Sequence, residues 1–502
     1  MKPESNSLTH RTLSGMAWVA WGSGVMAVLK VVVLVLLTRL LSPADFGVVS
    51  AALIIIVFAL TFSQLGLGPA LVQRPDLQPR HVSTAFFASV AFGLVAGGLI
   101  WLAAPLIAGF FRMEALASVV RVLALQFPIL GFSAVAESLL QRNLRFRLLA
   151  NADVVTYGLG YGTGIVLAFL GWGLWSLVAA HLLQSVLRAA ILLRAEPPKL
   201  RPRPTWQSFW ELMDYGFGQS AGRIGVFLAN QADNLVVGRF LGAVALGLYS
   251  RAYQLMAVPT ALLGDVLDRV LFPTMARVQD DPRRLASAYL QGTAFIALVT
   301  LPAGVVAAVL APELVNVAFG NKWAALVSPF QVLALGMMFR TSYRMSDSLS
   351  RATGKVYRRA WRQALYAALV LLGAWVGQFW GVVGVAAGVL VALFINYVLM
   401  AQLSLSVGHI TWLRFMQAQL PAIWLTLLVG GAAFAVVTVT RHLGFPPVAG
   451  LLGGSAAAAG IAVFAAWIAP GVTLGEYGMR MRDTLRAYFR GRLGPAPAQG
   501  PA

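Results

Sequence analysis

Basic and amide side chains recur within long apolar segments of this chain, and ionisable groups in such segments tend to face a cavity or a partner. The segment over residues 212–239 places Arg223, Asn230 and Asn234 near one helical face, with Asp233 beside them. A guanidinium here suits an anionic ligand, because its planar fork matches the geometry of phosphate. It also suits a buried ion pair that holds helices together. The sequence leaves both roles open for Arg223, and Asp233 is either a proton- or cation-linked group or a counter-charge.

Further basic residues extend this candidate cavity. Lys30 corresponds in position to Asn230, so it either faces the same cavity or extends its ammonium toward the membrane surface. Arg251 lies early in the apolar segment that follows residue 240. Arg340 and Arg344 are four residues apart on one helical face and are expected to line the inner half of the cavity. The predicted substrate-binding set is Lys30, Arg223, Asn230, Asp233, Arg251, Arg340 and Arg344.

Aromatic and polar stripes follow the same helical spacing elsewhere. Asp153, Tyr157 and Tyr161 are each four residues apart, and the next apolar segment carries His181 and Arg188. Such faces stack on sugars in some proteins and pack into cores in others, and both roles remain open here. Together these residues describe a cationic cavity with aromatic and amide groups interspersed, which suits a substrate that carries phosphate and sugar.

Motifs of soluble catalysis are missing from the sequence. Gly354-Lys355 is followed by Val356, and no GxxxxGK[ST] phosphate loop occurs anywhere. There is no HExxH motif, the five histidines are scattered, and the absence of cysteine excludes disulfides and thiolate metal sites. We therefore expect no enzymatic activity, no metal site and no cofactor, and leave coupling to H⁺ or Na⁺ open.

The amino-acid composition indicates that these segments lie in a lipid bilayer. Of the 502 residues, 59% are hydrophobic and only 11% are charged, whereas soluble domains carry about 25% charged residues. A helix needs about 20 apolar residues to cross a bilayer. On that measure the fold class is all-α integral membrane, with about 14 transmembrane helices. The segments cover residues 14–39, 44–66, 83–108, 116–139, 148–170, 172–193, 212–239, 244–272, 285–310, 324–349, 359–380, 382–405, 417–440 and 447–469.

The connections between these segments alternate between basic and nearly neutral sequences. The basic set includes Arg142, Arg145 and Arg147, whereas Gly171-Trp172-Gly173 and Gly381 typify the neutral set. The positive-inside rule then places both termini in the cytoplasm. The net charge of +20 is explained by this topology and by anionic lipid headgroups, so we expect no nucleic-acid partner.

Two short sequences have the form of helix starts. Ser42-Pro43-Ala44-Asp45 combines an N-cap serine, a proline in the first turn and an acidic third position. Asp280-Asp281-Pro282 has the same character before the ninth segment. We expect a helix to begin at each of them.

A weak internal repeat relates the two halves of the chain. The residues from Arg39 to Gly47 parallel those from Arg239 to Gly247, and Ser50 then matches Ser250. Because each copy contains six spans, the copies are expected to be parallel repeats around an axis along the membrane normal.

The repeat predicts two pseudo-symmetric six-helix bundles around a central cavity, plus two extra C-terminal helices. The expected bounds are 1–195 for the N-terminal bundle, 196–209 for a Pro-rich basic cytoplasmic linker, 210–408 for the C-terminal bundle, 409–471 for the extra hairpin and 472–502 for a basic cytoplasmic tail.

The chain resembles the polysaccharide transporters (Wzx-type flippases) of the multidrug/oligosaccharidyl-lipid/polysaccharide exporter superfamily over roughly residues 8–420. The resemblance implies a flippase that moves an undecaprenyl-pyrophosphate-linked oligosaccharide, an O-antigen or exopolysaccharide repeat unit, from the cytoplasmic to the periplasmic leaflet by alternating access. The stretches that carry it include LTRLLSPADFGVVSAA at 37–52, ESLLQRNLRFRLLANADVV at 137–155 and QADNLVVGRFLGAVALGLYSRAYQL at 231–255.

The same resemblance implies a location in the bacterial cytoplasmic (inner) membrane, with a polysaccharide polymerase and chain-length machinery as candidate partners. Two other functions are weighed against it. A drug or metabolite antiporter of the same superfamily should show carboxylates in its cavity, where basic groups dominate here. A membrane-embedded glycan polymerase or glycosyltransferase should have large extramembrane loops or an Asp-x-Asp metal site, and the sequence has neither.

Overall fold

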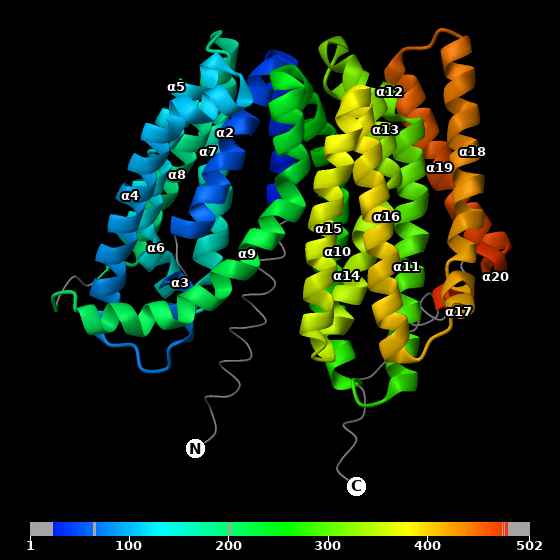
Figure 1. Ribbon diagram of the computed structural model, residues 1–502. Helices are drawn as coiled ribbons and strands as arrows, with labels where there is room; N and C mark the ends of the chain where they lie inside the picture. Colours follow the sequence, from blue (N-terminus) through cyan, green and yellow to red (C-terminus); the bar gives the residue numbers. More distant parts are fainter. Residues whose placement is uncertain (1–23, 64–66, 199–201, 474, 476, 480–502) are drawn as a thin grey trace. The chain divides into compact units, whose positions relative to one another are not determined.

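A computed structural model describes residues 24–63, 67–198, 202–473, 475 and 477–479. Within those ranges all regular structure is helical and no strand is present (Figure 1). The side chain of Arg223 and the predicted basic tail beyond residue 479 lie outside what the structure describes. The predicted all-α architecture is confirmed.

Within the described residues, each predicted segment coincides with a helix or with consecutive short helices. Residues 14–23 of the first segment and 64–66 of the second lie outside what the structure describes. Besides a helix over residues 24–40, the helices are α2 (Pro43–Ser63), α3 (Leu67–Gln73), α4 (Pro79–Phe111), α5 (Glu114–Leu123), α6 (Gln126–Arg142), α7 (Phe146–Phe169), α8 (Leu174–Ala195), α9 (Trp206–Phe240), α10 (Gly242–Arg277), α11 (Pro282–Val309), α12 (Ala311–Ala318), η1 (Asn321–Leu326), α13 (Val327–Leu335), α14 (Met337–Ala352), α15 (Val356–Gly377), η2 (Gln378–Trp380), α16 (Gly381–Gly408), α17 (Trp412–Gln417), α18 (Leu420–His442), α19 (Pro447–Ile468) and α20 (Pro470–Thr473).

Ten stretches of the described residues are long and apolar enough to cross a membrane. One of them, Tyr357–Gly408, contains both α15 and α16. These helices pack closely because Gly373 faces Gly388, where a Cβ on either residue would lie 2.2–2.7 Å from the other's carbonyl oxygen. The helix over 24–40, α9 and α10 are the remaining predicted spans, so the count of about 14 is compatible with the structure and stays a prediction.

Both predicted helix starts are confirmed. The backbone N–H of Asp45 donates to the Ser42 hydroxyl, and the Asp45 carboxylate accepts from the backbone N–H of Ser42 at 2.9 Å. This reciprocal pair is a capping box. The carboxylate of Asp281 accepts from the backbone N–H groups of Arg283 and Arg284 at 3.0 and 3.1 Å.

The described residues form two compact units. One contains the chain through Arg251 with 318–323 and 374–385, and the other contains 252–317, 324–373 and the chain from Ala386 on. Helix α9 begins at Trp206, within the stretch predicted as a linker, because Thr205 caps it by accepting from the Ser208 backbone N–H. The predicted domain bounds stay a prediction.

Within the first unit, the repeat-matched starts of α2 and α10 pack directly on each other. A Cβ built on Gly47 would lie 1.8 Å from the Ala243 carbonyl oxygen, and one built on Gly247 would lie 1.8 Å from that of Pro43. The hydroxyl oxygens of Ser50 and Ser250 are 3.3 Å apart. Matched positions therefore contact each other reciprocally, as expected for a local two-fold relation between the repeats.

Arg39 and Arg239, which also occupy matched positions of the repeat, each donate a hydrogen bond to a carbonyl oxygen at the end of another helix. Arg39 donates through Nε to the Ala318 carbonyl oxygen at the end of α12. Arg239 donates through Nη1 to the Phe110 carbonyl oxygen at the end of α4. We refer to Gly47, Gly247, Ser50, Ser250 and the two arginine contacts as the repeat contact.

Replacing Gly247 with alanine is expected to destabilise the protein by about 1–3 kcal/mol, the range for overpacked sites, because the new methyl group would overlap the backbone of α2. The matched control is Gly98→Ala in α4, where a Cβ meets nothing within 4 Å. Thermal unfolding of both purified variants tests this prediction, and equal melting temperatures would contradict it.

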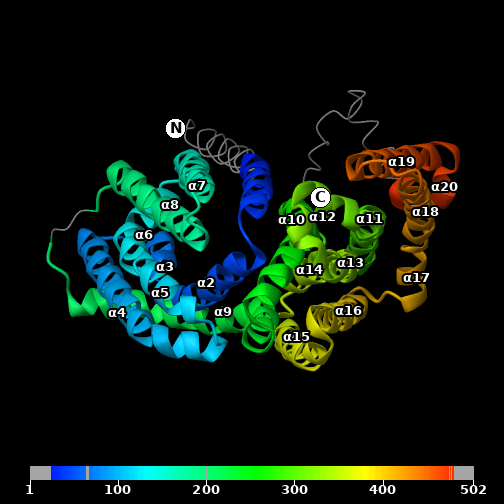
Figure 2. The same cartoon turned by 90° about the horizontal axis from the view of Figure 1, so that it is seen from above.

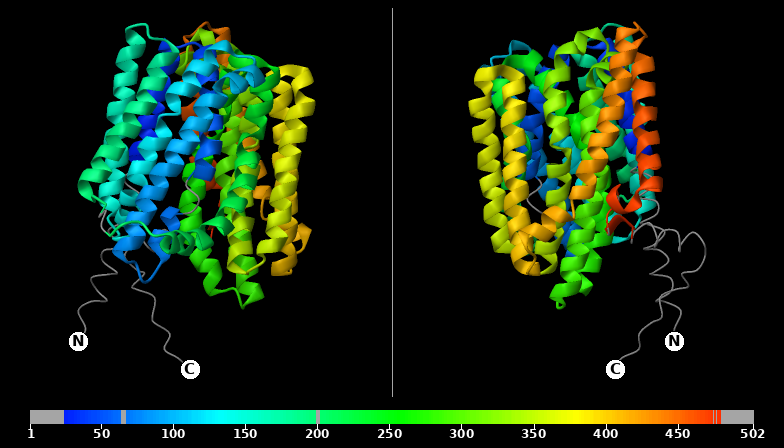
Figure 3. Two further views of the ribbon diagram at one scale, coloured as in Figure 1. Left: turned by 60° about the vertical axis from the view of Figure 1, so that its left-hand side comes forward. Right: turned by 90° about the vertical axis from the view of Figure 1, so that its right-hand side faces the viewer.

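The extra C-terminal hairpin of α18 and α19 is anchored to the second unit. Figure 3 shows the two helices side by side, and Leu425, Val429 and Ala433 of α18 pack with Ala458 of α19 in one buried cluster. Arg441 donates from Nε and Nη2 to both carboxylate oxygens of Glu313, at 2.6 and 2.9 Å. This bidentate pair holds α18 against α12.

Candidate functional site

Asp233 is a buried carboxylate near the C-terminal end of α9. Its side chain is 1% exposed, and it accepts hydrogen bonds from the Tyr249 hydroxyl at 2.7 Å and from the Asn234 backbone N–H at 2.8 Å. The hydrogen bond from Tyr249 ties α9 to α10. Asn230, one turn earlier, is exposed.

Lys30 is also exposed, on the helix over residues 24–40, and its neighbours Val28, Val31 and Val32 are exposed as well. The structure therefore gives Lys30 and Asn230, the matched positions, a similar degree of exposure. The proposed roles of both, and of Arg223, stay predictions.

Arg251 lies among aromatic rings in the first unit. Its guanidinium sits over the Phe46 ring, 4.9 Å from the centroid, and it is within electrostatic reach of Tyr157, Tyr161 and His181. Aromatic faces attract a guanidinium without neutralising its charge. A cation held in this way keeps its attraction for an anion.

The aromatic stripe predicted on α7 packs against α8. Tyr157 and Tyr161 are neighbouring rings with centroids 4.4 Å apart, and the Tyr161 hydroxyl lies 3.0 Å from His181 Nε2. Figure 2 shows α7 and α8 side by side. The structure thus brings together the two stripes that the spacing placed on separate segments.

One turn nearer the start of α7, three charged side chains form an ion cluster. Arg188 of α8 donates to both carboxylate oxygens of Glu137 at 2.7 and 3.0 Å and, through Nε, to Asp153 at 2.8 Å. We call these residues the Glu137–Arg188–Asp153 cluster. Sequence reasoning missed Glu137, although a signal existed: it is the one acidic residue in the apolar segment over residues 116–139.

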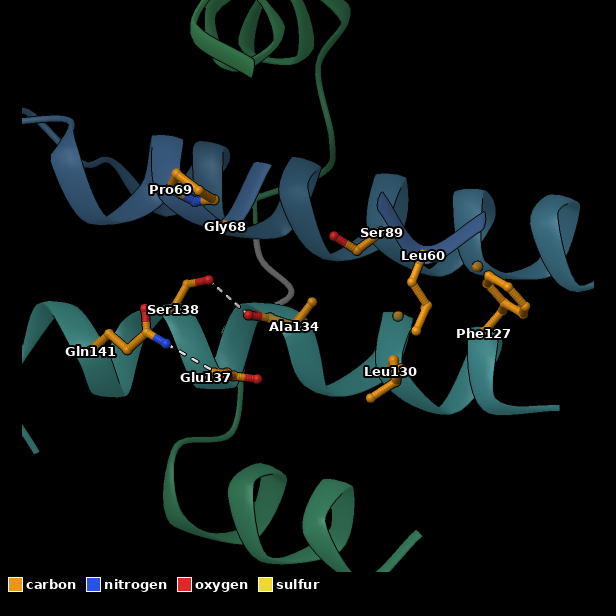
Figure 4. A pocket seen from close by; sticks show the side chains of 12 residues that line it. Leu60, Gly68, Pro69, Ser89, Phe127, Leu130, Ala134, Glu137, Ser138 and Gln141 are labelled. Carbon is orange, nitrogen blue, oxygen red and sulfur yellow. Dashed lines mark hydrogen bonds between the residues drawn. The ribbon is translucent and has the colours of Figure 1, made fainter. Parts of the chain in front are cut away.

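A cavity of about 230 Å³ adjoins this cluster. Figure 4 shows Glu137, Ser138 and Gln141 of α6 on one side of it, with Ser89 and Leu60 from other helices opposite. Gln141 donates to Glu137 at 3.4 Å. Helix α6 therefore supplies most of the polar side chains of this cavity, and it also contributes Phe127, Leu130 and Ala134.

The arginines of α14 occupy the second unit. Arg340 donates to the Tyr253 hydroxyl and lies over its ring, 4.8 Å from the centroid. In the part of the chain that the structure describes, Arg340 forms no ion pair. Arg344 packs against Gly264, whose missing side chain makes the room: a Cβ there would lie 2.2 Å from Arg344 Nη1.

The other charged residues of α14, Asp347 and Arg351, form an ion cluster with Arg359 of α15. Asp347 pairs with Arg351 at 3.1 Å and also accepts from Arg359. The charges of α14 are therefore divided between an ion cluster at its end and two arginines, Arg340 and Arg344, that contact α10. Tyr253 was missed by sequence reasoning, but Tyr249 and Tyr253 show the four-residue spacing already noted for Tyr157 and Tyr161.

The arrangement can bind anions in each unit. Arg251 is backed by rings in one, and Arg340 is backed by a tyrosine in the other. Guanidinium groups match the geometry of phosphate oxygens. Across the described ranges, no group of three or more His, Asp or Glu side chains is placed to hold a metal ion.

Comparison with known proteins adds to this geometry. The model of a family described as polysaccharide biosynthesis protein matches residues 36–329. The chain is 25% identical to the teichuronic acid biosynthesis protein TuaB of Bacillus subtilis over 442 residues, which cover 87% of this chain and 91% of TuaB. It is 26% identical to the lipopolysaccharide biosynthesis protein WzxC of Escherichia coli, with 78% and 80% covered.

Solved structures share the fold. The inward closed conformation of the lipid II flippase MurJ superposes with a TM-score of 0.72 at 14% identity, covering 94% of this chain and all of that one. An inward-facing multidrug resistance MATE family transporter of the MOP superfamily gives a TM-score of 0.58 at 17% identity, with 78% and 94% covered. At such identities the likeness concerns the fold alone.

Proposed function

This chain belongs to the polysaccharide biosynthesis protein family, and from that membership we propose that it is a multi-pass inner-membrane flippase for a lipid-linked oligosaccharide. The substrate is an undecaprenyl-pyrophosphate-linked repeat unit, which moves from the cytoplasmic to the periplasmic leaflet. The protein catalyses no covalent step in this scheme.

The surroundings of Arg340 are the observation that most supports this proposal. A charged side chain within the bilayer is costly and is retained where it serves a partner or a pathway. Arg340 is held by the ring and hydroxyl of Tyr253, and neither group carries a compensating charge. The predicted cavity set contains five basic residues and one acidic residue, Asp233. A pyrophosphate would supply the missing negative charge.

The aromatic residues suit the rest of the substrate. Tyr157 and Tyr161 present neighbouring rings beside Arg251, so sugar rings can stack there while the cation attracts phosphate or an acidic sugar. The prenyl chain stays in lipid, because the proposed cavity is polar and the outer helix faces are apolar.

The repeat contact supports a mechanism of alternating access. Glycine-to-backbone packing at Gly47 and Gly247 closes α2 against α10 at the end of the spans that the positive-inside rule places outward. In this conformation the repeat contact would seal the periplasmic side. Release of substrate then requires α2 and α10 to separate.

Orientation and partners complete the proposal. Both termini lie in the cytoplasm according to the alternation of basic and neutral connections. A polysaccharide polymerase and chain-length machinery would act on the translocated product. An antiporter for cationic drugs is the less suitable function, because its cavity should be acidic, whereas the residues that we predict to bind the substrate are mostly basic.

Purified protein in proteoliposomes is expected to move a labelled lipid-linked oligosaccharide across the bilayer without ATP. Protection of the label from a membrane-impermeant enzyme measures the movement, and protein-free liposomes give the background. A cognate substrate that remains in its original leaflet, while a flippase of known activity works in the same assay, would contradict the proposal.

A further inference from the structure

The first two turns of α9 differ from the rest of that helix in direction. α9 has 35 residues, whereas a membrane span needs only about 20, so about 15 of its residues are more than a crossing requires. Figure 1 shows that the first part of α9 runs across the place where α3 ends and α4 begins, and that only its later part follows the direction of the spans. We call residues 206–213 the α9 start segment.

One face of the α9 start segment is fixed to the first unit. Leu212 and Met213 are buried in a cluster with residues of α3, α4 and α6. The Glu211 carboxylate accepts from Arg74 Nη2 at 2.6 Å, and the same oxygen lies 3.0 Å from His81 Nε2. These contacts hold the segment at the level at which α3 ends and α4 begins, which is the end of a span.

The opposite face of the segment presents two indole rings. Trp206 is 72% exposed and Trp210 is 52% exposed, and their ring centroids are 5.7 Å apart. Phe209 lies beneath them and stacks on Trp206 at 5.2 Å. Gln207 and Arg203 are exposed beside the indoles. Tryptophan is enriched at membrane–water interfaces, because the ring is apolar and its N–H seeks a polar partner.

The charges around the segment favour an anionic surface. Glu211 is paired with Arg74. The other charged residues beside these two form no ion pair in the part of the chain that the structure describes, and they are Arg80, Arg142, Arg203 and Asp76. Three cations against one acid leave an excess of positive charge, which the headgroups of anionic phospholipids complement.

We propose that the α9 start segment is an anchor in the membrane interface, with the indoles of Trp206 and Trp210 among the phospholipid headgroups and Arg203 close to their phosphates. Amphipathic helices lie along a bilayer surface in this way. Here the polar side of the interface is the first unit itself, to which Glu211 fixes the segment. The anchor therefore sets the level at which α9 enters the bilayer.

The depth of Gln207 in a bilayer tests the proposal. The chain has no cysteine, so Gln207→Cys accepts a single nitroxide label in the full-length protein. The protein is placed in vesicles of phosphatidylethanolamine and phosphatidylglycerol. Power-saturation electron paramagnetic resonance then compares the access of oxygen, which concentrates in lipid, with that of a nickel chelate, which stays in water.

Two reference positions calibrate this depth. Gln279→Cys lies in the exposed turn between α10 and α11 and represents water. Val95→Cys, at a position 60% exposed near the middle of α4, represents the hydrocarbon core. The oxygen-to-nickel access ratio at Gln207→Cys is expected to fall between those at the two references.

The indoles are tested separately, which also provides the test if the label disturbs the segment. Bromine atoms on an acyl chain quench the fluorescence of tryptophans that they meet. The double variant Trp206→Phe, Trp210→Phe should lose part of the quenched emission. The loss should be larger with bromine near the headgroup end of the chain than with bromine near its methyl end, because interfacial indoles lie close to the headgroups.

Four outcomes would overturn the assignment. A ratio at Gln207→Cys equal to that at Gln279→Cys would place the segment in water, and one equal to that at Val95→Cys would place it in the hydrocarbon core. Low access to both reagents would show that a protein covers the segment. Equal quenching in the wild type and the double variant would show that the indoles do not meet lipid. These measurements contain no transported substrate, so their failure leaves the flippase proposal standing.

Discussion

Arg340→Ala is expected to slow translocation of the lipid-linked oligosaccharide by at least about thirtyfold. Removing one partner of a buried, hydrogen-bonded charge pair costs about 2 kcal/mol or more, and each 1.4 kcal/mol is about a tenfold change. In our proposal that partner is the substrate pyrophosphate, which Arg340 meets while Tyr253 supports its guanidinium. Initial rates in proteoliposomes provide the measurement.

Matched variants separate this role from a structural one. Arg340→Lys keeps the charge but loses the planar fork, so translocation should be intermediate. Tyr253→Phe keeps the ring and removes the hydroxyl, which should reduce the rate about tenfold, the lower end of the range for a hydrogen bond to a charged group. Arg358→Ala removes an exposed charge and should have no effect. An Arg340→Ala protein that is as abundant and as active as the wild type would show that Arg340 does not contact the substrate.

Arg188→Met is expected to destabilise the protein by an amount at the lower end of about 3–5 kcal/mol, the range for breaking a buried ion pair. The loss leaves Glu137 and Asp153 close together without a cation. Both carboxylates are partly exposed, so water relieves some of the penalty. Thermal unfolding in detergent, followed by intrinsic tryptophan fluorescence, measures the change.

A compensating variant provides the control for this prediction. Combining Arg188→Met with Glu137→Gln and Asp153→Asn removes both carboxylate charges and should recover most of the lost stability. If Arg188→Met alone melts with the wild type, the Glu137–Arg188–Asp153 cluster contributes no net stability. If the triple variant is no more stable than Arg188→Met, the loss comes from packing rather than from charge.

Much of the fold follows from the sequence because lipid imposes a simple rule on it. Each span must be long, apolar and helical, and within the described residues the predicted segments coincide with helices. The capping signals at Ser42 and Asp281 are equally local and were confirmed. Short helices such as α3 and α5 were not predicted, because breaks within an apolar run leave little trace in its hydropathy.

The internal repeat was predicted from the sequence, but the contact between its matched residues was not. Alignment of Gly47 with Gly247 and of Ser50 with Ser250 indicated two related units. It did not indicate that matched residues touch, because contact depends on how the helices cross. The distances at Gly47, Gly247, Ser50 and Ser250 supply that information.

The candidate site was predicted in part. Helical spacing grouped Arg340 with Arg344, and Tyr157 with Tyr161, since both arguments need only one helix. Partners on other helices were missed, among them Tyr253 for Arg340 and Glu137 for Arg188. Spacing along one helix does not say which neighbour a side chain will meet.

A reversible cross-link across the repeat contact tests the central claim, transport by alternating access, most directly. The chain has no cysteine, so the double variant Ser50→Cys, Ser250→Cys introduces the only thiols, at positions whose hydroxyl oxygens lie 3.3 Å apart. Translocation should stop when these thiols are oxidised to a disulfide and resume when a reductant is added, while either single variant should transport under both conditions. Translocation at the wild-type rate with cross-linking complete would contradict the account, because α2 and α10 would then not need to separate.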